Sequence, residues 1–353
     1  MSLIDMRGGL DEGREFPLEQ PPLDAPGYRE KYWACGYDGA ARIGFSIWLE
    51  TTAADYSVWQ EVVHVVLPDG RIFLSSTETP RMTPSGVGGR LAAGTCEAPF
   101  HKWSYRVRSA MEAATAAGLA RRPEEGPTPA AGPAADVALD LALVSTAPAW
   151  NLSRAGSASA AEAAFATQYR QLFRATGDVR VGGDFHAGVE ATGFRAHSSG
   201  PYHGTTFGGH SMISVQFPSG RGAGFLQHVR PDGSAIVSQA FVLEGDAVIP
   251  AQVAEAPRTL PGLSPGGERF TVRLRTDARD YLVGVEILVN VTSVRPNYFA
   301  STARTQADRA ILSARGDGLA NAISYGRFEL DGETGFGVIE RSTLTSRLQV
   351  QSG

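Results

Sequence analysis

The stretch VVHVVLPDGRIFLSST, residues 62–77, consists of two short apolar segments on either side of Pro68-Asp69-Gly70. β-Branched and aromatic residues such as those in both segments favour strands. Asp-Gly is typical of tight hairpin turns, because glycine accepts the positive φ angle that they need. The stretch therefore predicts a β-hairpin, with strands from Val58 to Leu67 and from Ile72 to Thr77.

The same pattern extends over most of the chain and predicts a mainly β protein. Segments with strand character are separated by further turns, among them Arg230-Pro-Asp-Gly233 and Leu330-Asp-Gly-Glu333. The 41 Gly and 21 Pro residues also disfavour a helical bundle, because both weaken helix interiors. The predicted strands are 41–50, 58–67, 72–77, 95–110, 135–146, 178–197, 209–217, 223–230, 235–243, 269–276, 281–294, 324–330 and 335–343.

The chain is long enough for two domains, since 353 residues exceed the usual size of one. We expect an N-terminal β-barrel domain at 1–156, with a mobile Ala/Pro/Gly-rich loop around 113–136, and a C-terminal β-barrel domain at 178–353. One helix is predicted to connect them over 157–177, because Ser159 can cap it and Phe165, Tyr169, Leu172 and Phe173 form one apolar face. The Pro-Asp-Gly turns at 68–70 and 231–233 indicate either a duplicated domain or merely a common turn.

Composition narrows the class of partner. The 32 basic and 37 acidic residues give a net charge of −5, and no basic block is present, so a nucleic-acid partner is disfavoured. Cys35 and Cys96 lack the spacing of a metal site. An acidic N-terminal stretch and the absence of a long apolar run predict a cytoplasmic protein without a transmembrane segment. Nothing in the sequence predicts the oligomeric state.

The histidines indicate where a site lies, because five of the seven fall between His186 and His228. On the strand after Val181, the residues Asp184, His186 and Glu190 share one face, which lines either a barrel interior or the solvent. Arg195 and His197 continue the opposite, apolar face and so are expected to point inward. A core imidazole bonded to a carbonyl is the alternative for His197. A metal-dependent barrel is a further alternative, but the spacing of His197, His203 and His210 does not fit one, so no metal is expected.

Three short motifs resemble the superfamily of carotenoid 1,2-hydratase and the AttH-like proteins. They are Gly193-Phe-Arg-Ala-His-Ser-Ser-Gly200, Gly335-Phe-Gly-Val-Ile-Glu-Arg-Ser342 and Phe100-His-Lys-Trp-Ser-Tyr-Arg-Val107, which has a central Trp103. The resemblance implies two lipocalin-like barrels and lyase or isomerase chemistry on terpenoid, steroid or aromatic molecules without a cofactor. In the family motif, Arg-Asp-His-Ser-Trp-Gly, the His and Trp lie in the substrate cavity. Here Arg195, His197 and Gly200 match, whereas Ala196 replaces the acid and Ser199 replaces the aromatic residue.

Two hypotheses follow. In the first, the chain is a cofactor-independent hydratase, dehydratase or isomerase that acts by general acid/base catalysis on a hydrophobic small molecule. His197 then exchanges a proton with Asp184, His186 or His210 as partner, while the remaining expected contacts to substrate come from Arg195, Tyr202, Glu190, Tyr298 and Trp103. In the second, the chain is a lipocalin-like carrier of a lipophilic molecule, which needs only an apolar lining.

Overall fold

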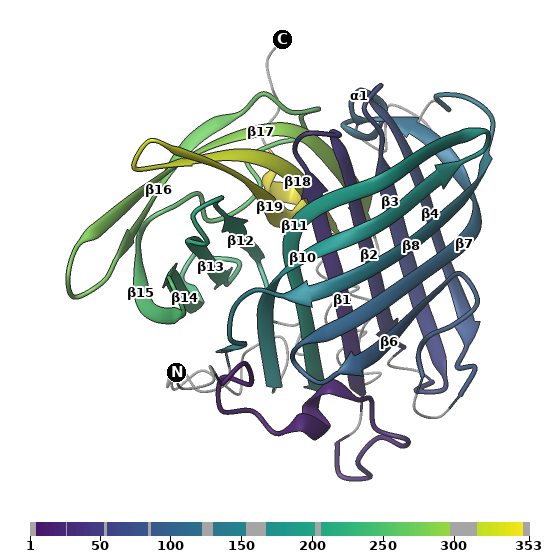
Figure 1. Ribbon diagram of the computed structural model, residues 1–353, viewed down its shortest axis with the longest axis horizontal. Helices are drawn as coiled ribbons and strands as arrows, with labels where there is room; N and C mark the ends of the chain where they lie inside the picture. Colours follow the sequence, from purple (N-terminus) through teal and green to yellow (C-terminus); the bar gives the residue numbers. More distant parts are fainter. Residues whose placement is uncertain are drawn as a thin grey trace. The chain divides into compact units, whose positions relative to one another are not determined.

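The computed structural model describes residues 5–25, 27–52, 55–83, 86–121, 130–152, 167–201, 206–296 and 316–348. The chain divides into two compact units, each with its own core. The first unit comprises residues 1–115, 130–154 and 167–200, and the second comprises 116–129, 155–166 and 201–353. Figure 1 shows that both units are built almost wholly from long antiparallel strands, which confirms the predicted mainly β fold.

The first unit consists of a short 3-10 turn, η1 (Glu12–Glu15), and eleven strands. The strands are β1 (Tyr28–Asp38), β2 (Ile43–Thr51), β3 (Val58–Val66), β4 (Arg71–Pro80), β5 (Val87–Gly88), β6 (Ala92–Ala98), β7 (Lys102–Thr115), β8 (Ala135–Ser145), β9 (Trp150–Asn151), β10 (Thr167–Val181) and β11 (Asp184–Pro201). They pair in the order β4-β3-β2-β1-β11-β10-β8-β7-β6-β5, and β4 also pairs with β7. That last pairing closes eight of the strands into a ring around one apolar core.

The second unit is a closed antiparallel barrel of eight strands in simple chain order. The strands are β12 (Gly209–Gln216), β13 (Gly222–Val229), β14 (Ala235–Glu244), β15 (Ala247–Glu255), β16 (Arg269–Arg275), β17 (Asp280–Arg295), β18 (Leu319–Leu330) and β19 (Glu333–Leu344). A short helix, α1 (Ala116–Leu119), and a 3-10 turn, η5 (Thr345–Arg347), belong to the same unit. Alternate residues of each strand, such as Ile213 and Val215, point into the barrel core.

The hairpin at 62–77 forms as predicted, with β3 and β4 joined by the turn at Pro68-Asp69-Gly70. Gly70 has a φ of +87°, which a residue with a Cβ adopts only with strain. The turn at 231–233 joins β13 to β14 and so follows the second strand of its ring, whereas the turn at 68–70 follows the third. The two turns are therefore not equivalent positions of a repeat, although both units are eight-stranded rings in which the first and last strands pair.

The predicted helix at 157–177 is wrong over residues 167–177, which belong to β10. Residues 169–173 are buried on both faces of this strand, so Leu172 and Phe173 look like one face of a helix although they point to opposite sides of a sheet. Residues 153–166 lie outside the described part of the chain. Since β10 and β11 both belong to the first ring, the predicted start of the second domain at 178 is also too early.

The loop expected around 113–136 differs in its described part. The chain continues β7 as far as Thr115, forms α1 over Ala116–Leu119 and enters β8 at Ala135. Residues 122–129 lie outside the described part of the chain. Strands β1 and β15 and the two-residue strands β5 and β9 were not predicted. The predicted strand 95–110 is in fact two strands, β6 and β7, divided by a turn at Phe100, whose φ is +59°.

Candidate functional site

The face of β11 that points into the first ring carries Arg195 and His197, as the alternation predicts. Val189 and Ala191 of the same face belong to the apolar core. The pairing of β11 with β10 runs without a register shift from Glu190 to Ser199, so the alternation is maintained along this part of the strand. Both side chains are buried, with 3% of Arg195 and 5% of His197 exposed. Both therefore need polar partners inside the ring.

Glu15 of η1 supplies the partner of Arg195. The two guanidinium nitrogens Nη1 and Nη2 donate to Oε2 and Oε1 of Glu15 at 3.0 Å and 2.7 Å. The Tyr169 hydroxyl donates to Oε1 at 2.6 Å, and the Trp103 indole nitrogen donates to Oε2. Gln171 accepts a further hydrogen bond from Arg195. We refer to Arg195, Tyr169, Trp103 and Gln171 together as the Glu15 clamp.

The electrostatics of the clamp favour a bound carboxylate. Burial lowers the pKa of Arg195, but the oxygens of Tyr169 and Glu15 outweigh it and hold the pKa above its usual value. Burial raises the pKa of Tyr169, and its hydroxyl is kept as a donor. Burial, followed by the charge of Glu15, also raises the pKa of the nearby Cys96 thiol to about 12. Arginine is suited to this position because its planar fork matches the two oxygens of a carboxylate.

A second polar group, which we call the His197 dyad, lies beside the clamp and consists of His197 and Glu30 of β1. The Nε2 atom of His197 lies 3.1 Å from Oε2 of Glu30. Its Nδ1 atom lies 2.6 Å from the carbonyl oxygen of Arg14. The imidazole ring stacks on the ring of Tyr32, with centroids 4.1 Å apart and planes inclined by 14°. His197 is thus fixed by contacts on both ring edges and one face.

The partners of His197 determine where its protons are. Both the Arg14 carbonyl and an ionised Glu30 carboxylate accept hydrogen bonds, so the two contacts together require a proton on each ring nitrogen. Glu30 Oε1 also accepts from the Leu18 N–H and from the Tyr56 hydroxyl, each at 2.8 Å. These donors favour the ionised carboxylate. The arrangement is therefore that of a buried imidazolium paired with a carboxylate.

The pKa of Glu30 agrees with this assignment. Burial raises it, but the hydrogen bond and charge of His197, followed by the bonds from Leu18 and Tyr56, hold the pKa below its usual value. A proton can pass between His197 and Glu30 because the two side chains are within hydrogen-bond distance. The dyad thus has the components of a general acid and a general base, shielded from water.

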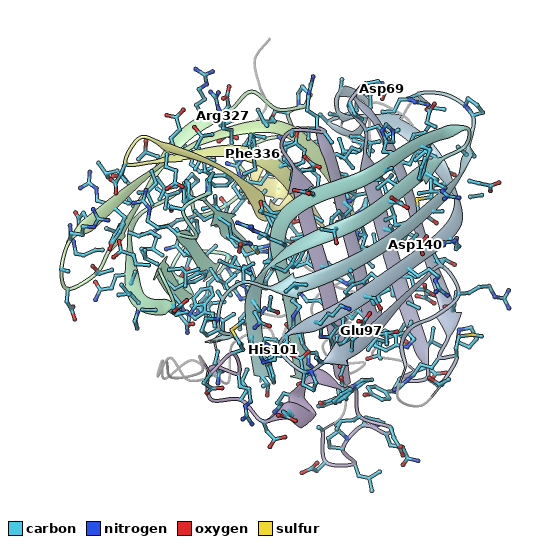
Figure 2. The ribbon with its side chains drawn as sticks, viewed as in Figure 1. Asp69, Glu97, His101, Asp140, Arg327 and Phe336 are labelled. Atoms are coloured by element: carbon cyan, nitrogen blue, oxygen red, sulfur yellow. The ribbon has the colours of Figure 1, made fainter. Side chains whose placement is uncertain are left out.

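Three residues predicted as members of the site lie on β11 but away from this interior. Glu190 is on the outer face, whereas Asp184 and His186 lie beyond a register shift, opposite Val181 and Val179 near the start of the strand. Asp184 is exposed and pairs with Arg71 at 2.8 Å. His186 is half-buried, and Glu190 is exposed. Asp184 lies near the turn that contains Asp69, and Figure 2 places Asp69 at the end of the ring opposite Glu97 and His101. In the first unit the structure therefore brings neither Asp184 nor His186 to His197.

The remaining predicted residues fall into three groups. Trp103 belongs to the clamp, as described. His210 belongs to the second unit, where Nδ1 contacts the Ser342 hydroxyl at 2.7 Å and Nε2 lies 2.9 Å from Glu340. Tyr202, His203 and Tyr298 lie outside the described residues. Elsewhere in the first unit, His64 of β3 is buried, and burial lowers its pKa to about 3.

Sequence reasoning missed Glu15, Glu30, Tyr32 and Tyr169. Glu15 lies in an irregular segment without any periodicity, and Glu30 stands between Arg29 and Lys31, a pattern typical of a solvated surface. The one available signal was that Glu30 and Tyr32 are two residues apart, which places them on one face of a strand with Ala34.

The described residues contain neither a metal-binding cluster nor a membrane-spanning helix. Among them, no three His, Cys, Asp or Glu side chains gather as a metal ion would need. Within the same part of the chain, no helix has the length and apolar character to cross a membrane. A depression of about 350 Å³ lies on the second unit between Arg269, Glu286 and Arg327. Both arginines pair with Glu286, so the three side chains form a charged, solvated surface.

Comparisons with known proteins agree with the fold. Neither a family model nor a curated protein matches the chain. Among solved structures, the chain is similar to a Nitrosomonas europaea protein provisionally described as an AttH, with a TM-score of 0.58 and 14% identity over 97% of this chain and 99% of that one. The chain therefore has the AttH-like fold.

Two further structures match over most of their length. Kievitone hydratase from Nectria haematococca gives a TM-score of 0.49 with 9% identity over 93% of this chain and 91% of that one. CghA gives 0.49 with 12% identity over 98% and 99%. The AttH-like resemblance predicted from the sequence motifs is confirmed for the fold by the Nitrosomonas europaea structure, and at 14% identity the likeness extends no further.

Proposed function

We propose that the chain is an enzyme of the hydratase, dehydratase or isomerase type, and that its first unit carries out general acid/base catalysis on a hydrophobic small molecule. The observation that carries the proposal is the His197 dyad, a buried imidazole held between the Glu30 carboxylate and the Arg14 carbonyl inside the ring of strands. A buried charged pair is expensive, and replacing such a pair by apolar residues often stabilises a protein. A role in proton transfer explains why the ring interior contains one.

In the proposed reaction, His197 gives its Nδ1 proton to one carbon of an alkene, and the cation that develops lies beside the electron-rich ring of Tyr32. Water adds to the neighbouring carbon and returns a proton to His197, so that hydration leaves the enzyme unchanged. Loss of a proton from another carbon gives an isomer instead, and the reverse of hydration is a dehydration. Arg195 and Tyr169 are suited to hold an oxygen substituent of the substrate.

The test begins with the small molecules that co-purify with the protein, identified by mass spectrometry. These, and a panel of conjugated enones, allylic alcohols and unsaturated carboxylic acids, are incubated with the enzyme in heavy-oxygen water and in heavy water. Incorporation of heavy oxygen indicates hydration, whereas deuterium incorporation alone indicates isomerisation. His197→Gln is expected to lower kcat/KM by about 100-fold or more, since a positioned acid contributes roughly that much.

His186→Gln is the matched control, because His186 lies on the same strand but eleven residues before His197, near the other end of β11. We expect its turnover to equal that of the wild type. Equal turnover in His197→Gln and the wild type would contradict the proposal. A co-purifying lipophilic molecule that binds tightly but is not converted, with no conversion across the panel, would identify a carrier instead.

A further inference from the structure

The polarity of the segment from Asp11 to Leu18 is the reverse of what burial normally selects. Glu15 is fully buried, whereas 43% of Phe16 and 41% of Leu18 are exposed. Glutamate is almost never fully buried unless it is paired. Pro17 is buried as well. The segment nevertheless does not dock by the large apolar side chains of Phe16 and Leu18, and the carboxylate of Glu15 makes its charged contact with the ring interior.

This segment occupies both polar groups of the interior at once. The Glu15 carboxylate takes the donors of the clamp, from Arg195, Tyr169 and Trp103. The carbonyl oxygen of the preceding residue, Arg14, accepts a hydrogen bond from Nδ1 of His197. Two adjacent residues, Arg14 and Glu15, thus occupy the hydrogen-bond donors of both groups. Arg195 is the cation that would bind a substrate oxygen, and His197 is the acid that would protonate a substrate.

The hydrogen-bond donors around the Glu15 carboxylate determine which kind of ligand could bind in its place. Arg195 presents two parallel N–H groups, and Tyr169 and Trp103 add one donor to each carboxylate oxygen. The rings of Trp103, Tyr169 and Phe100 lie around the guanidinium, with centroids 5.6, 5.4 and 5.9 Å from its central carbon. The surroundings suit a carboxylate attached to an aromatic or aliphatic body.

We propose that residues 11–18 act as an internal ligand, and that the molecule which replaces them is a hydrophobic carboxylic acid whose carboxylate takes the place of Glu15 on Arg195. A proton-accepting atom of the same molecule then takes the place of the Arg14 carbonyl at His197. The second contact rests on the proposed function, whereas the carboxylate contact does not. The acid and the segment compete for the same donors, so the segment lowers the apparent affinity for the acid.

The test measures binding by titration calorimetry, with 1-naphthoate, cinnamate and dodecanoate as probes and the primary amide of each as its neutral partner. Glu15→Ala frees the clamp and is expected to bind at least one acid tenfold or more tighter than the wild type does. The amides are expected to change by less than twofold. Glu12→Ala is the matched control, because Glu12 belongs to the same turn but is exposed and pairs with Arg7 at 3.5 Å.

The double variant Glu15→Ala/Arg195→Met removes the cation of the clamp. It is expected to lose the increase in affinity for the acid that Glu15→Ala shows. Equal gains for acids and amides, no gain for any acid in Glu15→Ala, or a gain that persists in the double variant would each overturn the proposal. None of these readouts involves turnover, so the binding site and the proposed reaction can fail separately.

Glu15→Ala leaves a buried arginine without its partner, and such a variant can fail to fold. In that case, amide hydrogen exchange in the wild-type protein tests whether an acid displaces residues 11–18. A saturating acid is expected to speed exchange at the amides of Gly13, Phe16 and Leu18, which bond to Asp11, Gly13 and Glu30 when the segment is docked. Exchange that is unchanged by all three acids would overturn the proposal.

Discussion

Two buried acid–base pairs, Arg195 with Glu15 and His197 with Glu30, lie in the interior of the first unit. Their charges cancel when both carboxylates and both bases are ionised, and each carboxylate also accepts hydrogen bonds from neutral donors. Such compensation is what makes burial of charge tolerable. Loss of one member leaves another unpaired, so the effects of single substitutions here are not expected to add.

The depressed pKa of Glu30 leads to a prediction about pH. The folded protein holds this proton less tightly than the unfolded chain, whose carboxyl titrates near 4.5. The stability that Glu30 contributes is therefore fully present above about pH 4.5 and is lost as the pH falls through the lower folded-state pKa. In Glu30→Gln this contribution is absent. We expect the difference in unfolding free energy between the wild type and Glu30→Gln to shrink as the pH falls.

Urea unfolding at a series of pH values from 7 to 3 measures that difference. Glu97→Gln is a control that keeps the interior unchanged, because Glu97 pairs with Lys102 in an exposed position. A difference between the wild type and Glu30→Gln that stays constant over the acid range would contradict the assigned charge of the dyad.

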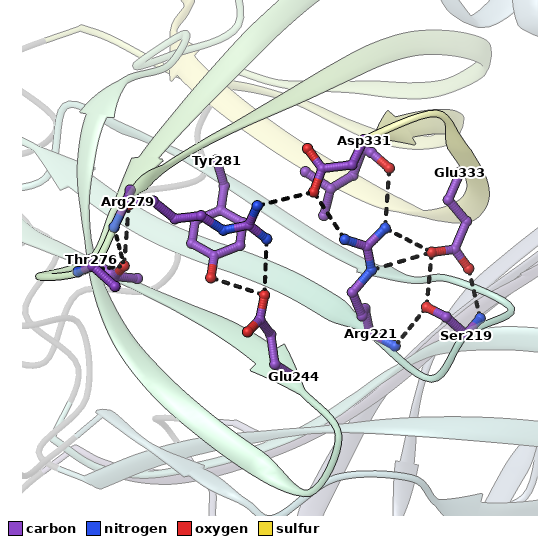
Figure 3. Close-up of polar contacts among 10 residues, drawn as sticks. Ser219, Arg221, Glu244, Thr276, Arg279, Tyr281, Asp331 and Glu333 are labelled. Carbon is purple, nitrogen blue, oxygen red and sulfur yellow. Dashed lines mark hydrogen bonds and ion pairs between the residues drawn. The ribbon is translucent and has the colours of Figure 1, made fainter.

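At the scale of elements, one end of the second barrel is held by side chains from its hairpin turns, as Figure 3 shows. Arg221, in the turn between β12 and β13, contacts Asp331 at 3.0 Å and Glu333 at 2.9 Å, both near the turn between β18 and β19. Arg279, just before β17, contacts Glu244 at the end of β14 at 3.0 Å. Asp331 also lies 3.4 Å from Arg279 and so links the two groups.

We expect Arg221→Met to lower the unfolding free energy of the second unit by about 1–2 kcal/mol, because it removes several charge-assisted hydrogen bonds at once. High salt is expected to reduce this difference, since these groups are partly exposed. Thermal unfolding at 0.05 and 1 M NaCl measures both effects. Arg273→Met, which removes one exposed pair with Glu255 at 3.5 Å, is the control and should have little effect. An equal loss in both variants would show that the network adds nothing to a single surface pair.

The elements also show what the sequence could and could not predict. Most strands were predicted from alternation and turns, and the inward direction of Arg195 and His197 followed from the same alternation. Strand β1 was missed because Arg29, Glu30 and Lys31 look solvated, whereas each is buried in the fold. Glu30 lies 167 residues from its partner His197. Pairing over such a distance depends on which strands become neighbours, and local sequence carries no signal of that.

At the scale of the whole molecule, the two units share a strand arrangement that could not be predicted from their sequences. Each is a ring of eight strands in which the first strand pairs with the last, β1 with β11 and β12 with β19. In each, the last strand carries a buried arginine, Arg195 or Arg341, whose partner is a glutamate outside the ring strands. The partners differ, since Glu15 is fully buried and 29% of the Glu268 side chain is exposed.

This comparison predicts unequal effects at the Arg341 pair. Arg341 is fully buried and donates to both oxygens of Glu268, at 2.8 Å and 2.6 Å. Arg341→Met leaves a partly hydrated carboxylate, whereas Glu268→Gln leaves a buried guanidinium without its counter-charge. We therefore expect Glu268→Gln to cost the second unit about 3–5 kcal/mol and Arg341→Met distinctly less, because an unpaired buried charge is the larger penalty.

The double variant Arg341→Met/Glu268→Gln is expected to be more stable than Glu268→Gln alone, since it removes the unpaired guanidinium. Urea unfolding followed by hydrogen exchange at the amides of β12 and β19 measures the loss in the second unit itself. If Arg341→Met proved the more damaging change, the arginine would act through packing against Phe270, whose ring centroid lies 5.2 Å from its guanidinium carbon, and not through its charge.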